Sequence, residues 1–525
     1  MGSYGSDQAT FVWLLAWWPH AIEHGAHPLL IDLVHAPDGW NLAWTSAIPG
    51  PALLAWPLTA VFGPIPAYDV LALAAPALSA WCAYLLCREL GTGGWAAAAG
   101  GLVFGFGSYE AAETLNHLNL ALVFTLPLAA LVVARYLRGA LSDGWFVALL
   151  ALCVVGIFAT FLETLFWATI GGAVALGAGL IVTRGSERAR LFRCLLLGAL
   201  AYGIALLAAS PYLWYLLAHP DPLAVSGRGF ELDLANLIVP TRVTEIRPGF
   251  VHDLAQRLGG QNLTEQVGYI GPVLPLLAGF ALWERRRQPL ARVLAVTIAV
   301  ATLCALGARL VVAGHRTRLE LPWALVDGLP LAGHALTIRA FVLVWLALAV
   351  AVALFLARGG RLRWLAFGLL ALTLVPSLDG SLWVTKLERP ALFQGDRWRA
   401  VVRPGENVLN IPLSFDGQAM LWQEEAGFGF RMTGGYVNAK VPDALWQHPV
   451  VRSLFGAPVP PFPARDLRAL ASERQVDVVL MPRSYPAPWP QLVSAAFGRP
   501  REVGGMLAWR VRGAWPRTLW PLSGG

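Results

Sequence analysis

The sequence predicts an all-α polytopic membrane bundle of about 10–12 transmembrane helices, followed by a small α/β domain outside the cytoplasm. Composition is the first observation, because hydrophobic residues make up 57% of the 525 residues and charged residues only 14%. Soluble domains carry roughly 25% charged residues, so this chain cannot face water on all sides. The composition excludes a disordered chain, a fibrous repeat, a disulfide-rich secreted scaffold and an ordinary cytosolic enzyme.

Apolar runs of membrane-spanning length are the second observation. A spanning helix needs about 20 mostly apolar residues, and the shorter runs found here are ambiguous between a span and a buried segment. A further run, 47–63, carries several prolines, which kink helices, so we expect it to lie in the interface or to re-enter the membrane. The expected spans are 67–87, 93–107, 117–137, 145–160, 164–183, 191–217, 268–284, 289–307, 338–357 and 361–377.

The placement of arginines is the third observation, and it orients the bundle. Arginines occupy alternate connections between the expected spans, whereas the intervening short connections 108–116 and 161–163 contain no Lys or Arg. The positive-inside rule places the arginine-bearing connections in the cytoplasm. The arginines concerned are Arg88, Arg135, Arg138, Arg184, Arg188, Arg190, Arg193, Arg285, Arg286, Arg287, Arg292, Arg358, Arg361 and Arg363.

This orientation predicts three regions: an outward-facing first loop with interfacial helices (1–66), a transmembrane helical domain (67–378) and an extracytoplasmic α/β domain (379–525). In the last region, polar and turn residues separate short strand-like runs from one helix-like stretch, a pattern that is typical of a small α/β domain. The expected strands are ENVLNIPL (406–413), VDVVLM (476–481) and GMLAWRV (505–511), and the expected helix is ARDLRALASERQ.

The start of the chain fits this orientation less well. Residues 10–18 are apolar but too short to span, and we expect an interfacial helix with Trp13, Trp17 and Trp18 as aromatic anchors. The orientation nevertheless places residue 1 outside. Either the chain lacks an upstream span, or the run 47–63 does span and the N-terminus is cytoplasmic. We expect that a first transmembrane helix is missing upstream or has been misassigned.

Metal, cofactor and nucleic-acid sites have little support. The five cysteines lie in or beside apolar runs without metal-ligand spacing. His20, Glu23 and His24 share one helical face but not in the metalloprotease order. We expect no cofactor; a divalent metal remains open but has no ligand pattern. The glycines of GGLVFGFGS (100–108) favour close helix packing over nucleotide binding. The short arginine clusters between apolar runs argue against nucleic acid.

Polar residues that gather at one face of a polytopic protein mark its candidate site. Glu163 stands out because a carboxylate inside an apolar run costs free energy unless it is paired or protonated, although a helix-end glutamate that reaches water is the alternative. His117 and Asn119 begin a span, and a capping Asn116 explains part of that motif without function. The candidate substrate-binding residues are His24, His117, Asn119, Glu163, Arg242, Glu265 and Arg339.

The order of several motifs resembles a known family. An acidic residue in GSDQ (Asp7) precedes a Trp/His-rich segment, a proline-rich segment ending in FGP (62–64) and a span ending in AYLLCREL. The small-residue span GGLVFGFGSY then leads into NHLNL, and the expected C-terminal domain faces outward. Over about residues 1–380, this layout resembles the GT-C superfamily of integral-membrane glycosyltransferases. The segments NIPLSFDGQAMLWQ and MTGGY (432–436) resemble the tails of an uncharacterised bacterial branch.

The resemblance implies a GT-C-like bundle in a bacterial inner membrane and an inverting transfer reaction. The donor would be a polyprenyl-phosphate sugar, and the acceptor an envelope glycan or lipid at the outer face. A first-loop carboxylate would act as the general base, which by position is Asp7, with Asp32 and Asp38 as alternatives. Arg242, His117 or Arg339 would hold the lipid phosphate by charge-assisted hydrogen bonds.

Two other functions stay open: a transporter or flippase for a lipid-linked glycan, and a catalytically silent scaffold of an envelope-glycan assembly complex. Transporters often show internal repeats and polar residues near the membrane midplane. We find no convincing repeat, and the polar residues gather at one face. This pattern favours the transferase.

Overall fold

The computed structural model describes residues 5–219, 229–258, 263–329, 332–414, 417–437 and 441–516. Backbone contacts divide the chain into two compact units. The first, called the helical unit here, contains residues 69–211 and 226–384. The second, called the mixed unit, contains residues 4–68, 212–225 and 385–525.

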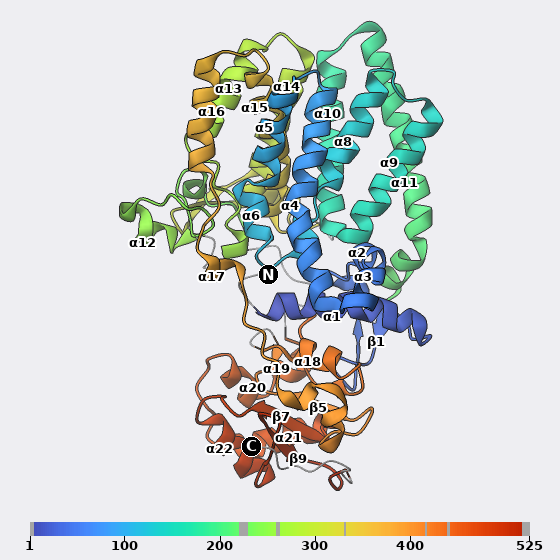
Figure 1. Ribbon diagram of the computed structural model, residues 1–525, viewed down its shortest axis with the longest axis vertical. Coiled ribbons are helices and arrows are strands. Elements are labelled where there is room, and N and C mark those ends of the chain that lie inside the picture. Colours follow the sequence, from blue (N-terminus) through green and yellow to red (C-terminus); the bar gives the residue numbers. More distant parts are fainter. Residues whose placement is uncertain are drawn as a thin grey trace. The chain divides into compact units, whose positions relative to one another are not determined.

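Apolar helices run side by side through the helical unit, and one coincides with each of the predicted spans except 117–137, which is divided between α7 and α8 (Figure 1). In the described part of the chain, α4, α7 with α8, α9, α10, α11 and η7 with α15 form six segments long and apolar enough to cross a membrane, and α13 and α14 are shorter. The chain is thus a multi-pass membrane protein. The helices are α4 (Pro64–Glu89), α5 (Gly94–Gly105), α7 (Leu118–Ala121), α8 (Thr125–Leu137), α9 (Asp143–Thr160), α10 (Leu162–Val182), α11 (Gly185–Ala218), α13 (Val273–Glu284), α14 (Pro289–Ala305), α15 (Phe341–Leu356) and α16 (Arg361–Thr373).

Helix α15 forms the centre of this unit, since all of its residues except the partly buried Leu346 are buried. The glycines of α5 let it approach its neighbours closely, as the sequence predicts. A Cβ atom built on Gly100 would lie 2.8 Å from the Ala349 oxygen in α15, and one on Gly105 would lie 2.3 Å from the Pro76 oxygen in α4. Only a residue without a side chain fits at such distances.

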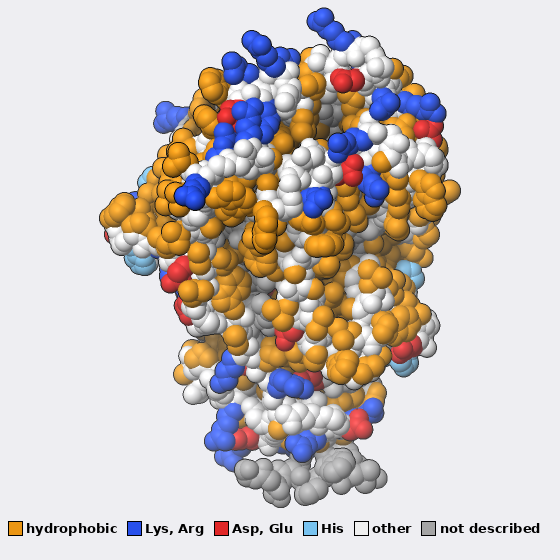
Figure 2. Space-filling model, turned by 45° about the horizontal axis from the view of Figure 1, so that its top comes forward, with side chains coloured by type: hydrophobic (Ala, Val, Ile, Leu, Met, Phe, Trp, Pro, Cys, Tyr) orange, Lys and Arg blue, Asp and Glu red, His pale blue; other side chains and the backbone are white. Residues whose placement is uncertain are grey.

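The connections that carry arginines contact one another at one end of the helical unit. Arg135 and Arg138 pair with Glu89 at the end of α4, while Arg193 at the start of α11 pairs with Asp143 at the start of α9. Arg358 and Arg363 likewise pair with Glu284 at the end of α13. Figure 2 shows Lys and Arg side chains gathered over this end, beside a largely hydrophobic surface. The arginines that occupy alternate connections in the sequence therefore lie together at one end of the helical unit.

Shorter elements occupy the opposite, alternate connections. Helix α6 is buried along its whole length, and a two-stranded hairpin follows α14. These elements are α6 (Ser108–Glu113), η2 (Leu234–Leu237), η3 (Gly249–Val251), α12 (His252–Ala255), η5 (Leu263–Glu265), β3 (Arg309–Val312), β4 (His315–Glu320), η6 (Pro322–Leu325), η7 (Thr337–Ala340) and α17 (Gly380–Trp383).

The mixed unit contains a five-stranded sheet of order β6-β5-β7-β9-β8. Strand β5 runs parallel to β6 and β7, whereas β9 runs antiparallel to β7 and β8. The three predicted strands and the predicted helix are confirmed as β5, β7, β9 and α21. The elements are η8 (Ala391–Phe393), η9 (Gly395–Ala400), β5 (Asn407–Asn410), α18 (Ala419–Glu425), β6 (Arg431–Met432), α19 (Asp443–Trp446), α20 (Pro449–Leu454), α21 (Pro463–Glu473), β7 (Val478–Pro482), α22 (Trp489–Phe497), β8 (Arg501–Val503) and β9 (Met506–Arg510).

The first part of the chain folds into this same unit. The run 47–63 divides into α2 (Pro49–Leu54) and α3 (Trp56–Phe62), both too short to cross a membrane. Before them come α1 (Gly5–Glu23), the two-residue strands β1 (Leu30–Ile31) and β2 (Trp40–Asn41), and η1 (Leu42–Trp44). The backbone of 33–36 bonds to that of 432–434 beside β6.

The expectation for α1 is wrong in one respect. Trp13, Trp17 and Trp18 are buried in the protein and are not interfacial anchors. Their indole nitrogens donate to Gln423 Oε1 and to the carbonyl oxygens of Pro28 and Ala47. A buried indole N–H needs such a partner, so these residues belong to the core of the mixed unit.

Candidate active site

A buried ion-pair network occupies the end of the helical unit away from the arginine-bearing connections. The Arg339 guanidinium, in η7 just before α15, donates one hydrogen bond of 2.6 Å to Glu163 Oε2 and another of 2.7 Å to Glu265 Oε1. Arg339, Glu163 and Glu265 are only 12%, 13% and 3% exposed, so the network is almost dry. One arginine of η7 thus joins this element to α10 and η5.

Local backbone geometry positions Glu163. It lies in the first turn of α10, where the helix dipole and free N–H groups favour a carboxylate. Its Oε1 atom also accepts a hydrogen bond of 2.6 Å from the backbone N–H of Leu336. Both carboxylate oxygens of Glu163 thus accept hydrogen bonds, which explains how a carboxylate is accommodated within an apolar run.

Helix α6 brings two more carboxylates to the same end. Glu113 is fully buried, and its Oε2 atom lies 2.7 Å from His117 Nδ1 one helical turn later. Glu110 is buried as well and accepts a hydrogen bond of 3.1 Å from Ser79 in α4. Tyr109, the residue before Glu110, is also buried, and the charges of Glu113, Glu110, Glu265 and Arg339 all act on it, so these groups lie near one another. We call Glu110, Glu113, His117, Glu163, Glu265 and Arg339 the carboxylate cluster.

The carboxylate cluster has unused hydrogen-bonding capacity. Among the described residues, Glu110 Oε2, Glu113 Oε1, Glu265 Oε2 and Arg339 Nε are buried without a hydrogen-bond partner. Four carboxyl groups share the charge of one guanidinium and of His117 when it is protonated, and buried charges without a partner are costly. Some of these carboxyl groups must therefore be protonated, or a bound group must supply hydrogen-bond donors.

The protonation of three of these groups follows from their surroundings. Burial raises the pKa of Glu113 to about 7, with its hydrogen bond to His117 acting in the opposite direction. Burial also raises the pKa of Glu110 well above its ordinary value. For Glu265, burial alone would raise the pKa, but the charges of Arg339 and His117 together hold it below the ordinary range. The cluster therefore combines a stable carboxylate, Glu265, with a carboxyl group that exchanges its proton near neutral pH, Glu113.

The structure brings four of the predicted site residues together: His117, Glu163, Glu265 and Arg339. Asn119 is buried in α7, two residues beyond His117. Arg242 is instead exposed and lies 4.0 Å from Asp379. The sequence analysis missed Glu110 and Glu113 as site members, although the four-residue spacing of Glu113 and His117 is a visible signal of contact on a helix.

The remaining predicted residues belong to the mixed unit. Asp7 lies half-buried in the first turn of α1, and Asp32 is exposed. Asp38 accepts a hydrogen bond of 2.7 Å from the buried Arg474. His24 is exposed and stacks on His20, with 4.1 Å between the ring centroids.

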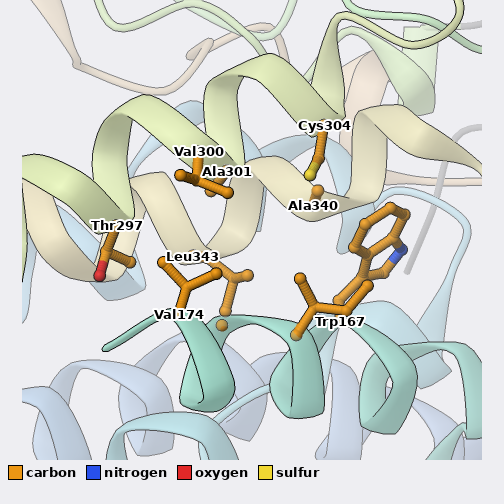
Figure 3. A pocket seen from close by; sticks show the side chains of 10 residues that line it. Trp167, Val174, Thr297, Val300, Ala301, Cys304, Ala340 and Leu343 are labelled. Carbon is orange, nitrogen blue, oxygen red and sulfur yellow. The ribbon is translucent and has the colours of Figure 1, made fainter. Parts of the chain in front are cut away.

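A crevice among α10, α14 and α15 lies deeper in the helical unit (Figure 3). Its volume is about 10 Å³, and its lining is almost entirely apolar, from Trp167, Val174, Ala301, Cys304 and Leu343 among others. A space of that size holds one water molecule at most, and a water needs several polar partners. The crevice is a packing defect and not a substrate site.

Solved structures with a similar fold include two membrane glycosyltransferases. One is the archaeal oligosaccharyltransferase AglB from Archaeoglobus fulgidus in complex with an inhibitory peptide and a dolichol-phosphate. It is 13% identical in sequence with a TM-score of 0.52, and the match covers 95% of this chain and 68% of AglB. The other is the arabinofuranosyltransferase AftD from Mycobacteria. It is 13% identical in sequence with a TM-score of 0.58, and the match covers 97% of this chain and 40% of AftD. This chain thus spans less than half of AftD. No curated protein sequence matches it.

The fold of the chain is that of a multi-pass membrane protein with a GT-C-like helical bundle. Residues 10–380 match the family described as a domain of unknown function (DUF6311). That match covers most of the chain, and the chain belongs to this family.

Proposed function

We propose that this protein is a membrane glycosyltransferase. It moves a sugar from a polyprenyl-phosphate donor to an envelope glycan or lipid acceptor at the outer face of a bacterial inner membrane. The observation that carries the proposal is a GT-C fold in which a cluster of buried carboxyl groups around Arg339 lies at the end of the helices away from the arginine-bearing connections. One of these groups, Glu113, exchanges a proton near neutral pH, where a general base works best.

Two carboxylates compete for the role of general base. Asp7 holds the first-loop position that the family resemblance implies, whereas Glu113 has the pKa that suits the chemistry. Asp38 is a weaker candidate because its carboxylate is already paired with Arg474. A base must come within about 3 Å of the acceptor hydroxyl, directly or through one water, so substitution of each residue separates them.

The donor phosphate needs a cation that is not already neutralised. Arg339 donates to two carboxylates in a cluster that is rich in negative charge, which disfavours a phosphate there. Arg242 is largely exposed, and its contact with Asp379 is long at 4.0 Å. We therefore favour Arg242 over Arg339 for the phosphate and assign Arg339 to the positioning of Glu163 and Glu265.

The test is a transfer assay on the purified chain in detergent. A panel of polyprenyl-phosphate sugars is added, and released polyprenyl phosphate is measured. We expect release from at least one donor, a loss of more than 100-fold on substitution of the base, and little change in Glu320→Gln, an exposed surface control. Loss in Glu113→Gln but not in Asp7→Asn assigns the base to Glu113, and the reverse assigns it to Asp7. Absence of release from every donor would refute the proposal.

A second candidate function is a carrier for a lipid-linked glycan. Buried ionisable residues in a helical membrane unit also mark proton-coupled transport, and Glu113 and Glu110 fit that description. Proteoliposomes loaded with a fluorescent polyprenyl-linked sugar distinguish the two. A carrier moves the intact lipid between leaflets without releasing polyprenyl phosphate, whereas a transferase releases it.

The sidedness in the proposal has its own test. Protease added to intact spheroplasts should digest the chain after residue 378 if that part is extracytoplasmic. Digestion only after lysis would reverse the orientation.

A further inference from the structure

A cavity of about 650 Å³ opens within the mixed unit, in a region that the proposed transfer reaction does not use. The segment from the end of α3 to the start of α4 forms one wall, and the segments around η8 and the end of α18 form the other. The lining residues are Phe62, Gly63, Pro64, Ile65, Pro66, Arg389, Phe393, Gln394, Gly395, Glu424, Glu425 and Gly427.

The polar side of this cavity contains a carboxylate with an unused acceptor. Glu425 is only 7% exposed and accepts a hydrogen bond from Arg389 Nε through its Oε1 atom. Its Oε2 atom is buried and has no hydrogen-bond partner among the described residues. A buried acceptor left unpaired is unfavourable, so a ligand donor that reaches Oε2 would gain free energy.

The charge of the lining limits what can bind. Glu424 and Glu425 outnumber Arg389, which is itself engaged with Glu425, and burial together with the neighbouring Glu425 raises the pKa of Glu424 to about 7. A phosphate or carboxylate would find Arg389, the cation of this lining, already engaged with Glu425. A neutral ligand with several hydroxyl groups would find acceptors in Glu425 and Glu424 and further polar partners in Gln394.

The opposite side of the cavity is apolar. Phe62 is 65% exposed, and Ile65, Pro64 and Pro66 continue this surface. A sugar ring has this same division, with hydroxyl groups around its edge and C–H groups on its faces. A cavity of this volume is within the range of small-ligand sites.

We propose that this cavity binds a neutral saccharide, with hydroxyl groups on Glu425 and a ring face on Phe62. This site is separate from the carboxylate cluster, and binding there needs no transfer reaction.

The experiment is equilibrium binding by calorimetry to the full chain in lauryldimethylamine oxide, since glycoside detergents would compete. Maltotriose, mannotriose and chitotriose are the probes. We expect saturable binding of at least one of them, weakened about tenfold or more by Glu425→Gln and by Phe62→Ala. The matched surface controls Glu502→Gln and Phe462→Ala should bind as the wild type does.

Three results would overturn the proposal: no binding of any of the three probes, wild-type binding by Phe62→Ala, or displacement of the saccharide by inorganic phosphate. Phe62 is exposed, so its truncation tests the site without risk to the core. The Glu113→Gln variant separates this inference from the proposed function, because it should bind saccharide normally even if it transfers no sugar.

Discussion

At one end of the helical unit, Arg193 is 65% exposed in its ion pair with Asp143, whereas at the other end Arg339 is buried between Glu163 and Glu265. The exposed pairs lie in water or at the membrane surface, where salt screens them. The buried network has no such screening, and each group depends on its partners. The same residue types therefore mark orientation at one end and hold a potential reaction site together at the other.

The largest effect should come from Arg339→Met. Removing the guanidinium leaves Glu163 and Glu265 buried without their counter-charge, which typically costs about 3–5 kcal/mol. Thermal unfolding of the purified protein in detergent measures this loss. The triple variant Arg339→Met, Glu163→Gln, Glu265→Gln should recover much of it, because no buried charge is then left unpaired. Equal loss in the single and triple variants would show that the packing of Arg339, and not its charge, stabilises this end.

Glu113 should make stability at the carboxylate end depend on pH. Burial raises its pKa in the folded protein from 4.5 to about 7, so the folded chain keeps a proton that the unfolded chain releases. The associated stability is fully present below pH 4.5 and is lost as the pH rises through 7, by at most about 3 kcal/mol.

Glu113→Gln removes this titration and tests its sign. The unfolding temperature of the variant relative to wild type should rise between pH 5 and pH 8. Glu320→Gln, at an exposed site, should show no such trend. A variant whose difference from wild type stays constant over this range would contradict the buried, titrating state of Glu113.

The difference between the two ends also explains what could be predicted from sequence. Arginine alternation and apolar runs are local patterns, so the ten helices and their common arginine end could be anticipated. Glu163 could be singled out because it interrupts an apolar run. Its pairing with Arg339 could not be predicted, since 176 residues separate the two and only packing brings them together.

Other features escaped prediction for physical reasons of their own. Helix α1 was expected at the membrane interface, yet its tryptophans are buried in the protein, and their burial stabilises the helix. The proposed saccharide cavity is lined by residues 62–66 and by residues beyond 388. Because these segments are far apart in the sequence, no local motif predicts the cavity. Helix α6 is short, and in the sequence its two glutamates are typical of a solvent-exposed loop. Only the tertiary fold shows that they are buried.

Close helix packing should support the carboxylate end, and Gly105→Ala tests this support. Gly105 is the last residue of α5, just before α6, and its added Cβ would meet the Pro76 oxygen at 2.3 Å and the Ala80 nitrogen at 2.6 Å. Overpacking of this kind costs about 1–3 kcal/mol, which a shift in unfolding temperature would reveal. In Gly172→Ala the new Cβ meets nothing within 4 Å, so that variant should be neutral or slightly stabilised. Similar shifts in both variants would mean that close packing at Gly105 is unimportant.

The smallest effect should come from Arg193→Met, the same substitution as at Arg339 but at the opposite end. Asp143 keeps access to water after the arginine is removed, and it also accepts a hydrogen bond of 3.0 Å from Tyr136, so no unpaired buried charge results. The unfolding temperature should fall slightly at low salt, and the difference from wild type should vanish at high salt because screening removes the attraction. Arg339→Met should keep its full loss at both salt concentrations, because its partners are shielded from ions. A salt-independent loss in Arg193→Met as large as that in Arg339→Met would mean that solvent exposure does not distinguish the two ends. Burial would then give no reason to prefer the carboxylate cluster as the site of chemistry.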